Sequence, residues 1–486
     1  MNILTTGLPY ANGALHLGHI YEWFLADTLA RLSHHTLTPS VWISGDDAHG
    51  VAVSNAARAN HVSPQKWVDQ LTQQRLDDLN NLNVLEVNYL STATPFHRTF
   101  VQNAYKKLKT KGLIQEVSSQ QYFSDVALFE RDVVGQCPSC HTQQYLGVCE
   151  NCQRSLEAGD LINPIDAASK KPVHLQNVKL DHFKWGLFRS VVEQWIDNTS
   201  HPDLKNKLLK DLKDLPDLWC IERVGEYFGV PVPGKSTHFY VWFDALLGYF
   251  SFAQELNLSL DHPLTHILGK DILTFHALRL PALCAALDLP LPNPLIVHGH
   301  VVGENRVKFS KSLNNAPNLS LLRETWGDDV LRYYLLRNTR GKTEDIPLIP
   351  TELDRCKSQL ANTIGNTFRR LHKIGHHHPL IPLSNEWKNK LETWDNIIPQ
   401  TLKTGNTAQW LERAEELLAE LAQTIQNQKW WLPEKQEDAQ QGYVVITQLI
   451  KRLQCVLPNH LTAAAELINN QAPAPSDTVF FKKGAL

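Results

Sequence analysis

Residues Gly7 to His19 read Gly-Leu-Pro-Tyr-Ala-Asn-Gly-Ala-Leu-His-Leu-Gly-His, and this stretch decides the fold. It follows a short apolar run, Ile3 and Leu4, that is typical of a strand. It precedes residues 20–32, where apolar side chains recur at helical spacing. The stretch is therefore a strand-to-helix turn that opens an α/β unit. Because a helix N-terminus presents backbone N–H groups and the positive end of the helix dipole, this turn is a natural phosphate site.

Two histidines in this turn are the first candidate functional residues. His16 and His19 are three residues apart, so they share one helix face if the first turn is regular. Each imidazole can donate a hydrogen bond to a triphosphate oxygen, and Gly18 between them has no side chain to hold a flat ligand off the backbone. Taken alone, a His-x-Gly-His pattern is weak, because surface or core histidines also explain it.

Composition indicates a soluble globular protein. The 486 residues are 43% hydrophobic and 20% charged, enough for about two to four domains with real cores. The net charge of −3 excludes a strongly basic nucleic-acid binder, so any RNA contact must come from local patches. We find no run of about 20 apolar residues and no signal peptide, so the expected location is cytoplasmic.

The pattern of elements predicts an α/β sheet domain with an insertion, followed by helices. Strands and helices alternate over residues 1–111 and again from about residue 234, where 239–243 reads as a buried strand. After about residue 345 strands disappear, and amphipathic helices are predicted over 353–374, 391–402, 408–428 and 438–456. The predicted divisions are a first half of the sheet domain (1–111), an insertion (112–233), a second half (234–305), a loop and linker fold (306–345), a helical bundle (346–468) and an extended tail (469–486).

Four cysteines within the predicted insertion have metal-ligand spacing. Cys137, Cys140, Cys149 and Cys152 form two C-x2-C pairs. Four thiolates close a tetrahedral shell around Zn²⁺ and leave no open position, so we expect one structural zinc ion per chain. The alternative is four free thiols, which the spacing disfavours.

Two acidic residues follow a predicted strand. Asp46 and Asp47 stand at the carboxyl end of the strand at 41–44, where ligands of parallel sheets bind. Helix capping is the alternative reading. We favour a functional role, because a free amino group needs a carboxylate partner at such an edge.

A second loop lies nearly three hundred residues after the first, and reads Lys308-Phe309-Ser310-Lys311-Ser312. Together with the turn at residues 7–19, it resembles the two signatures of class I aminoacyl-tRNA synthetases. The amino-acid sequence of these stretches is similar to that of the methionyl-tRNA synthetases, and the resemblance runs from residue 2 to about residue 465. It implies a Rossmann-like catalytic domain, an inserted zinc-knuckle connective domain and an α-helical anticodon-binding bundle.

The resemblance implies how ATP would be held. ATP and Mg²⁺ would enter as substrate, with the phosphates against His16, Gly18 and His19, and Asp271 would contact the nucleotide. The lysine-serine loop would close over ATP, with Lys311 neutralising charge on the leaving pyrophosphate and Lys308 assisting. The family usually has methionine where Phe309 stands, and a large apolar side chain fills the same space.

The resemblance also implies a methionine pocket. Asp47 would hold the ammonium group, and aromatic edges would suit the polarisable sulfur. Without the motifs around them, the pocket aromatics would read as core residues. Leu246 replaces a frequent proline, and Glu222 and Val224 flank Arg223 where the family has serine and aspartate. The implied pocket residues are Leu8, Tyr10, Asp47, Trp242, Ala245, Tyr249 and His298.

In the helical region, three residues match the family's readers of the CAU anticodon of tRNA-Met. Asn366 and Arg370 lie four apart on one predicted helix, and Trp431 follows a long helix. An amide, a guanidinium and an aromatic ring are what recognition of unstacked bases requires. A buried tryptophan and a solvated arginine are the alternative.

The implied activity is that of a methionine–tRNA ligase, which activates methionine with ATP and transfers it to tRNA-Met. One alternative is a paralogous ligase that hands the acyl group to a small amine. Another is a non-catalytic tRNA-binding relative. No oligonucleotide-binding domain is recognisable after residue 465, so a monomer is expected.

Overall fold

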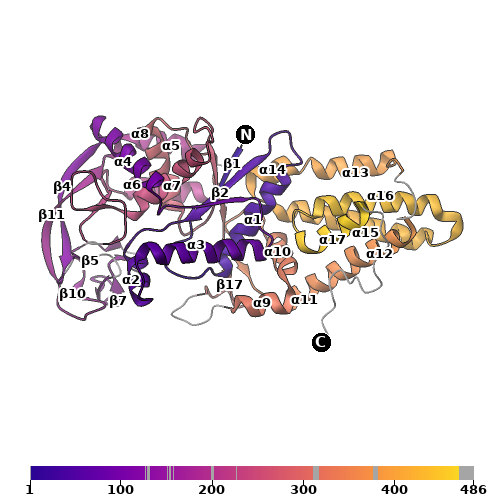
Figure 1. Ribbon diagram of the computed structural model, residues 1–486, viewed down its shortest axis with the longest axis horizontal. Helices are drawn as coiled ribbons and strands as arrows, with labels where there is room; N and C mark the ends of the chain where they lie inside the picture. Colours follow the sequence, from indigo (N-terminus) through magenta and orange to yellow (C-terminus); the bar gives the residue numbers. More distant parts are fainter. Residues whose placement is uncertain are drawn as a thin grey trace.

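The structure is a computed structural model. It describes residues 2–125, 127–128, 132–149, 151–152, 155–156, 158–198, 202–225, 227–309, 317–375 and 381–469. The chain is elongated, with a sheet domain and its insertion at one end and a bundle of helices at the other (Figure 1). Across the described residues, no helix is both long and apolar enough to cross a membrane.

A five-stranded parallel sheet forms the centre of the sheet domain. Its strand order is β16-β15-β1-β2-β3, so the first strand of the chain lies beside one that begins more than 250 residues later. Ile3 pairs with Leu264 on one side and with Val41 on the other. The strands are β1 (Asn2–Thr6), β2 (Ser40–Asp46), β3 (Val87–Ser91), β15 (Leu264–Gly269) and β16 (Ile296–His298).

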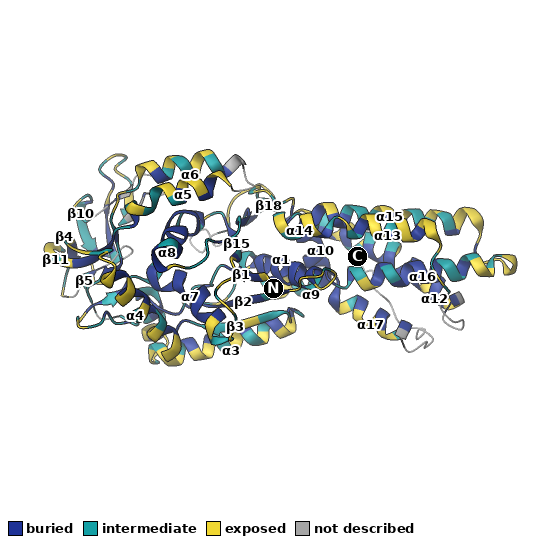
Figure 2. Ribbon diagram, turned by 90° about the horizontal axis from the view of Figure 1, so that it is seen from above, coloured by how far each residue is buried: buried dark blue, intermediate teal, exposed yellow. Residues whose placement is uncertain are grey.

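Helices cover the sheet and connect its strands. Ser63 and Thr94 cap two of them, each followed by a proline in the first turn, as helix starts favour. In Figure 2, α1 and the strands β1 and β2 are mostly dark blue because most of their residues are buried, whereas the outer helices have one exposed face. The helices are α1 (Leu17–Ser33), α2 (Val51–Ala59), α3 (Pro64–Asn81), α4 (Pro95–Thr110), α7 (Val241–Glu255), the π-helix η3 (Phe275–Arg279) and α8 (Leu280–Leu287).

The predicted strand at residues 239–243 is wrong for most of its length. Only β14 (His238–Phe239) is a strand there, and α7 begins at Val241. Every residue of α7 from Phe243 to Ala253 is buried. A short apolar run buried all round does not distinguish a strand from a helix by periodicity, which explains the error.

The insertion combines small antiparallel sheets with two helices. Its longest pair, β4 (Ile114–Phe123) and β11 (His174–Phe183), is in register over all of its length. The two helices pack into the same core as α7 and α8, through residues such as Val192 and Leu208. The other elements are β5 (Ala127–Leu128), β6 (Val133–Gln136), β7 (Gln143–Tyr145), β8 (Gly147–Val148), β9 (Ser155–Leu156), β10 (Ile162–Asp166), the 3-10 helix η2 (Trp185–Phe188), α5 (Arg189–Asp197), α6 (Pro202–Asp214), β12 (Trp219–Cys220) and β13 (Glu222–Arg223).

The C-terminal half is helical, as predicted, but its helices are divided differently. The region predicted as one helix over 391–402 is two helices, because Pro399 lies in the first turn of a new one. The helix after Leu457 was not predicted. The elements are β17 (Val301–Val302), α9 (Leu319–Trp326), α10 (Asp328–Arg337), β18 (Ile346–Pro347), α11 (Pro350–Gln359), the π-helix η4 (Leu360–Gly365), α12 (Asn366–Gly375), α13 (Asn385–Asp395), α14 (Ile398–Thr404), α15 (Thr407–Gln428), the 3-10 helix η5 (Pro433–Lys435), α16 (Gln436–Leu453) and α17 (Pro458–Asn469). Most of the predicted tail, 470–486, lies outside the described residues.

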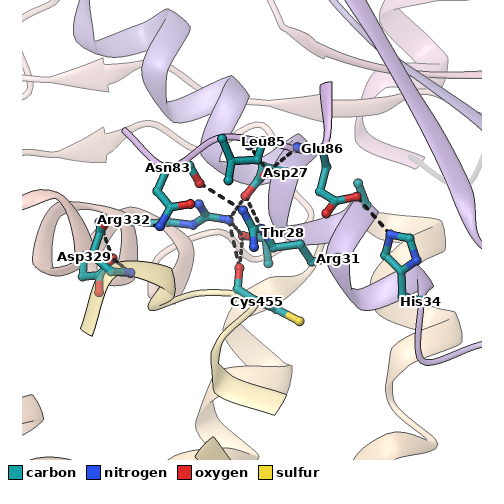
Figure 3. A network of polar contacts seen from close by, with 12 residues as sticks. Asp27, Thr28, Arg31, His34, Asn83, Leu85, Glu86, Asp329, Arg332 and Cys455 are labelled. Carbon is teal, nitrogen blue, oxygen red and sulfur yellow. Dashed lines mark hydrogen bonds and ion pairs between the residues drawn. The ribbon is translucent and has the colours of Figure 1, made fainter. Parts of the chain in front are cut away.

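One hydrophobic core joins the two halves. It runs from Leu4 and Trp42 in the sheet, through α1, to α10 and the helices that follow it. A buried polar cluster fixes this joint, shown in Figure 3. The Arg332 guanidinium of α10 donates to Asp27 and Thr28 of α1 and to the carbonyl of Cys455, which follows α16. The helix that begins at His19's turn is thus tied directly to the helical bundle.

Candidate active site

The carboxyl ends of the parallel strands meet at one edge of the sheet, and the candidate residues lie there. Thr6 ends β1, Asp46 ends β2, Gly269 ends β15 and His298 ends β16. The N-terminus of α1 follows β1 and lies at the same edge. The expectation of a site at this edge, drawn from the parallel sheet, fits the arrangement of the described residues.

The two histidines of the turn cap α1 reciprocally. His16 is the N-cap, and its Nδ1 accepts from the backbone N–H of Gly18 at 3.1 Å. Nδ1 of His19 accepts from the backbone N–H of His16 at 3.3 Å, and the two rings stack with centroids 3.8 Å apart. Because Nδ1 accepts in both rings, Nε2 carries the hydrogen in the neutral imidazoles, which is the form that can donate to a phosphate oxygen.

Gly18 leaves space for the neighbouring His16 ring. A Cβ at this position would lie 3.0 Å from two atoms of the His16 ring. The space beside the Gly18 backbone therefore accommodates that ring. Glycine at this position permits the histidine pair to stack.

Charged side chains surround Asp271, which follows β15. His300 Nε2 lies 3.3 Å from the Asp271 carboxylate, and Lys308 also contributes positive charge. The hydrogen bond to His300 and these charges lower the pKa of Asp271, so it remains ionised. Lys308 forms a β-bridge with Val302, at the start of the predicted lysine-serine loop. Lys311 lies outside the described residues.

The two neighbouring acids at the end of β2 have opposite environments. Asp46 is fully buried, and its carboxylate is bound by Arg75, Thr72 and Tyr89. The interpretation of Asp46 as part of an acidic pair for an amino group is therefore wrong, because its oxygens are already used. In contrast, Oδ1 of Asp47 is buried and, among the described residues, has no hydrogen-bond partner. Burial, followed by the charge of Asp244, raises the pKa of Asp47 well above its ordinary value.

An aromatic cluster lies close to Asp47. Trp242 stacks on Phe275 with centroids 4.0 Å apart, and Tyr249 donates its hydroxyl hydrogen toward His276 Nε2 at 2.8 Å. Leu8 adjoins Tyr249 through its backbone, and Asp47 is among the groups whose charge acts on that phenol. Tyr10 is paired with Asp47 through an isolated β-bridge. Leu8, Tyr10, Asp47, Trp242 and Tyr249 are therefore brought together, while Ala245 lies on the same helix as the two aromatics.

His276 also belongs to this cluster, although the sequence did not place it among the pocket residues. Its Nδ1 donates to the carbonyl of Ile272 at 3.0 Å, so Nε2 is the acceptor for Tyr249. Burial lowers the pKa of His276 to about 4, which keeps the ring neutral. A signal was available, because Phe275 and His276 follow the sheet-end residues 269–271 directly in the sequence.

His298, by contrast, has partners on α1. Its Nε2 lies 3.0 Å from Glu22, and its ring meets Tyr21 edge-on. The structure pairs His298 with this carboxylate, and it is His276 that contacts Tyr249 and Trp242.

The departures from the expected family pattern have structural explanations. Glu222 is fully buried and accepts from Lys235 and from the backbone N–H of Asp181, so it anchors the insertion. Its neighbour Arg223 stacks over the Tyr240 ring at 3.7 Å. Leu246 is buried in the core that α7 shares with the insertion.

The four cysteines of the insertion fit a tetrahedral metal site. Their sulfur atoms lie within 4.8 Å of one another, with Cys137 and Cys152 3.7 Å apart and Cys140 and Cys149 3.6 Å apart. A Zn–S bond of about 2.3 Å in tetrahedral geometry requires sulfur atoms about 3.8 Å apart. Hydrogen bonds, first from Thr142, lower the pKa of Cys140 to about 5, which favours the thiolate that binds metal. The cluster is compatible with zinc.

The predicted anticodon residues lie on the helical bundle. Asn366 begins α12, where it accepts from Arg369 at 2.6 Å, and Arg370 is exposed. Trp431 is 51% exposed, although its neighbour Trp430 is buried against α16. Because half of the Trp431 side chain is exposed, Trp431 is not a core residue and is available for contact with a partner.

Comparison with known proteins defines the class first. A family model described as tRNA synthetases class I (M) matches residues 2–372. Among solved structures, two of Mycobacterium tuberculosis methionyl-tRNA synthetase, bound to methionyl-adenylate, share the fold at 20% identity. Their TM-scores are 0.76 and 0.77, and each match covers 99% of this chain and 97% of the other.

Curated relatives then define the family. Methionine–tRNA ligase of Buchnera aphidicola (strain Tuc7) is 32% identical over 392 residues, which are 76% of this chain and 71% of the relative. Methionine–tRNA ligase of Wigglesworthia glossinidia brevipalpis is 31% identical over 389 residues, 76% of this chain and 70% of the relative. The chain belongs to the class I (M) family of tRNA synthetases, and the resemblance seen in the sequence is confirmed.

Proposed function

We propose that the protein activates L-methionine with ATP to methionyl-adenylate and transfers the methionyl group to the 3′ end of tRNA-Met. The observation that carries this proposal is the buried Oδ1 of Asp47, which has no hydrogen-bond partner among the described residues and lies beside the aromatic cluster, at the sheet edge where the histidine-capped helix α1 begins. An ammonium group would satisfy that oxygen. The names of the relatives, all methionine–tRNA ligases, point to the same substrates.

In the first step, a carboxylate oxygen of methionine attacks the α-phosphorus of ATP, and the bond to the pyrophosphate oxygen breaks. In the second step, a terminal ribose hydroxyl of tRNA attacks the activated carbonyl, and AMP leaves with the electron pair. Mg²⁺ entering with ATP supplies charge neutralisation at the phosphates. The protein contributes orientation and electrostatic stabilisation, and no covalent enzyme intermediate is required.

Four side chains are the candidates for charge stabilisation. His16 and His19 would donate from Nε2 to the phosphates, and Lys308 and Lys311 would approach the leaving pyrophosphate. Removing one such donor costs about 3 kcal/mol of transition-state stabilisation. We expect Lys308→Ala to lower kcat of ATP–pyrophosphate exchange about a hundredfold. Lys171→Ala, which removes an exposed lysine from a surface ion pair, is the control and leaves kcat unchanged.

The side-chain pocket suits a thioether. Because the Tyr249 hydroxyl donates to His276, the two polar groups satisfy one another. An apolar side chain can then be buried against them without leaving a donor unpaired. Trp242 and Phe275 add stacked ring surface that matches a polarisable sulfur.

Asn366, Arg370 and Trp431 would read the CAU anticodon. Base stacking on an aromatic side chain contributes about 1–3 kcal/mol. We therefore expect Trp431→Ala to lower tRNA charging about tenfold or more while leaving ATP–pyrophosphate exchange unchanged. Leu432→Ala, an exposed neighbour, is the matched control. An equal loss in both reactions would argue against a role in tRNA recognition.

The cysteine cluster would hold one structural zinc ion. The donors are Cys137, Cys140, Cys149 and Cys152. Metal analysis of the purified protein should give one zinc per chain, and Cys149→Ser should lose it. Cys284→Ser, at a buried cysteine outside the cluster, should retain it. Equal zinc in the two variants would contradict the assignment.

The whole proposal is tested by amino-acid-dependent ATP–pyrophosphate exchange across the twenty amino acids, followed by charging of tRNA-Met. Exchange with methionine, together with charging, is the expected result. Exchange without charging would indicate a ligase for a small amine. No exchange by the folded protein would indicate a non-catalytic tRNA-binding relative.

A further inference from the structure

Behind the predicted ammonium site lies a buried chain of polar side chains that the reaction as described does not use. Its centre is Asp244 of α7, which is fully buried. His49 Nδ1 lies 3.1 Å from one oxygen of this carboxylate, and His97 Nε2 of α4 lies 3.2 Å from the other. Both histidines are also buried, with exposed fractions of 5% and 0%. Both oxygens of Asp244 are thus held by imidazoles, one from each side.

His49 connects this carboxylate to Asp47. Its backbone N–H donates a hydrogen bond to Asp47, while its ring bonds to Asp244. In the part of the chain that the structure describes, the ion-pair partners of Asp244 are these two histidines alone. His49 therefore bonds to two carboxylates, those of Asp47 and Asp244. Among the described residues, no lysine or arginine forms an ion pair with Asp244.

The series of hydrogen bonds continues from His97 towards the aromatic cluster. His97 Nδ1 lies 2.7 Å from Ser251 Oγ, which in turn contacts the carbonyl of Gly248 at 3.0 Å. Gly248 precedes Tyr249, and a Cβ added there would lie 3.2 Å from the Leu8 side chain. The same hydrogen-bonded chain thus reaches both Asp47 and the wall of the aromatic pocket.

The charges on the two acids are expected to differ. Burial acts to raise the pKa of Asp244, but its two histidines outweigh this, so its pKa lies below the ordinary value. Asp47 has its pKa raised by burial and then by the charge of Asp244. The other groups that act on Asp47 are Asp46, whose charge raises its pKa, and Arg75, whose charge lowers it. Asp244 therefore remains a carboxylate and makes the potential at Asp47 more negative.

We propose that Asp244, held by His49 and His97, is a second buried anion of the amino-acid site and a positioning residue for ammonium recognition. It acts through His49, which orients Asp47, and through its own negative charge behind Asp47. The inference rests on the proposed function and deepens it. It predicts that the site selects ligands with a protonated amine over ligands of the same shape without one, and that Asp244 supplies part of that selection.

Two ligands that differ only in the amine test this inference. L-methioninol carries the ammonium group and the thioether, and 4-(methylsulfanyl)butan-1-ol carries the thioether alone. Both are measured as competitive inhibitors against methionine in ATP–pyrophosphate exchange by the full chain. We expect Asp244→Asn to raise the inhibition constant of methioninol by about tenfold or more, the effect of one charge at short range in a partly screened site. The inhibition constant of the uncharged alcohol should stay within about twofold.

A matched control separates charge from folding. Asp329→Asn makes the same change at another fully buried aspartate, which is bound by Asn459 and His460 in the other half of the molecule. It should leave the ratio of the two inhibition constants unchanged. If Asp244→Asn weakens both ligands equally, Asp244 has only a structural role and the inference is wrong.

A second pair of variants tests the link through His49 without altering α7. His49→Ala should reduce the preference for methioninol, whereas His49→Asn, which keeps a donor near the position of Nδ1, should restore it. Equal constants for these two variants would overturn the proposed link. If the unmodified protein supports no methionine-dependent exchange, the proposed function fails instead, and the two failures are distinguishable.

Discussion

Asp27, which is fully buried, and Asp47, whose Oδ1 is buried, differ in how completely their carboxylates are hydrogen-bonded. Asp27 of α1 accepts from Arg31 at 2.7 Å, from Arg332, and from the backbone N–H groups of Leu85 and Glu86 (Figure 3). Asp47 lies at the sheet edge with its Oδ1 buried and, in the described structure, without a partner. A saturated carboxylate joins elements together, whereas an incompletely satisfied one is a place for a ligand.

The same contrast separates adjacent residues. Asp46 points back to Arg75 and is saturated, and Asp47 is not. Successive residues of a strand point to opposite faces, so a strand end can carry one structural and one functional acid side by side. The comparison therefore predicts opposite consequences for one substitution made at different aspartates.

The largest effect is expected at the joint. Asp27→Asn should lower the free energy of unfolding by about 3–5 kcal/mol, because Arg332 would remain buried without its anion. Denaturant unfolding measures this change. At a temperature where the variant is folded, KM for methionine should stay within about twofold. A variant as stable as the unmodified protein would show that the ion pair contributes little to the joint.

The same change at the open site should affect catalysis. Asp47→Asn should lower kcat/KM for methionine by a factor of about thirty to a thousand, because the ammonium loses its counter-charge. This factor corresponds to a loss of about 2–4 kcal/mol of transition-state stabilisation. Stability should stay equal or rise, since a buried carboxylate oxygen without a hydrogen-bond partner, as Oδ1 is among the described residues, opposes folding. Unfolding and exchange measurements on the same preparation check both parts. A loss of stability as large as that of Asp27→Asn would remove the distinction between the two sites.

A pH profile sharpens the comparison further. A protonated, neutral Asp47 does not attract an ammonium group. Burial and the charge of Asp244 raise the pKa of Asp47, whereas a hydrogen bond from His49 and the charge of Arg75 lower it. Methionine affinity should therefore fall as the pH drops through this raised pKa, by about tenfold per unit below it. The acid limb of kcat/KM for methionine should lie well above pH 4, and Asp244→Asn should move it to lower pH. A limb near the ordinary aspartate pKa would contradict an enclosed Asp47.

The smallest effect is expected from a single hydrogen bond at the joint. Thr28 contacts both Arg332 at 2.9 Å and the carbonyl of Cys455 at 3.2 Å. Thr28→Val keeps the shape and removes the hydroxyl, so stability should fall by about 1 kcal/mol. Thermal unfolding measures it, with Thr393→Val on the exposed face of α13 as the control. A change as large as that of Asp27→Asn would mean that the hydroxyl, not the charge, maintains the joint.

The local sequence predicted part of the fold. Helical periodicity predicted α15 to within one residue, because the amphipathic pattern lies within the helix itself. The run at 239–243 failed, because α7 is buried all round and shows no helical periodicity. The predicted helix over 391–402 is divided before Pro399. The proline itself indicated this division, and the prediction did not use it.

The sequence by itself determined which chemical groups are present: two histidines at a strand-to-helix turn, four cysteines at metal-ligand spacing and an acid after a strand. The tertiary structure alone decided which of the two adjacent acids has its oxygens already bonded, that His276 contacts Tyr249, and that His49 bonds to both Asp244 and Asp47. These facts depend on partners about 30 to nearly 200 residues away in the chain. Residue type and spacing specify what a side chain can do, but its partners, burial and charge are set only where distant segments pack together.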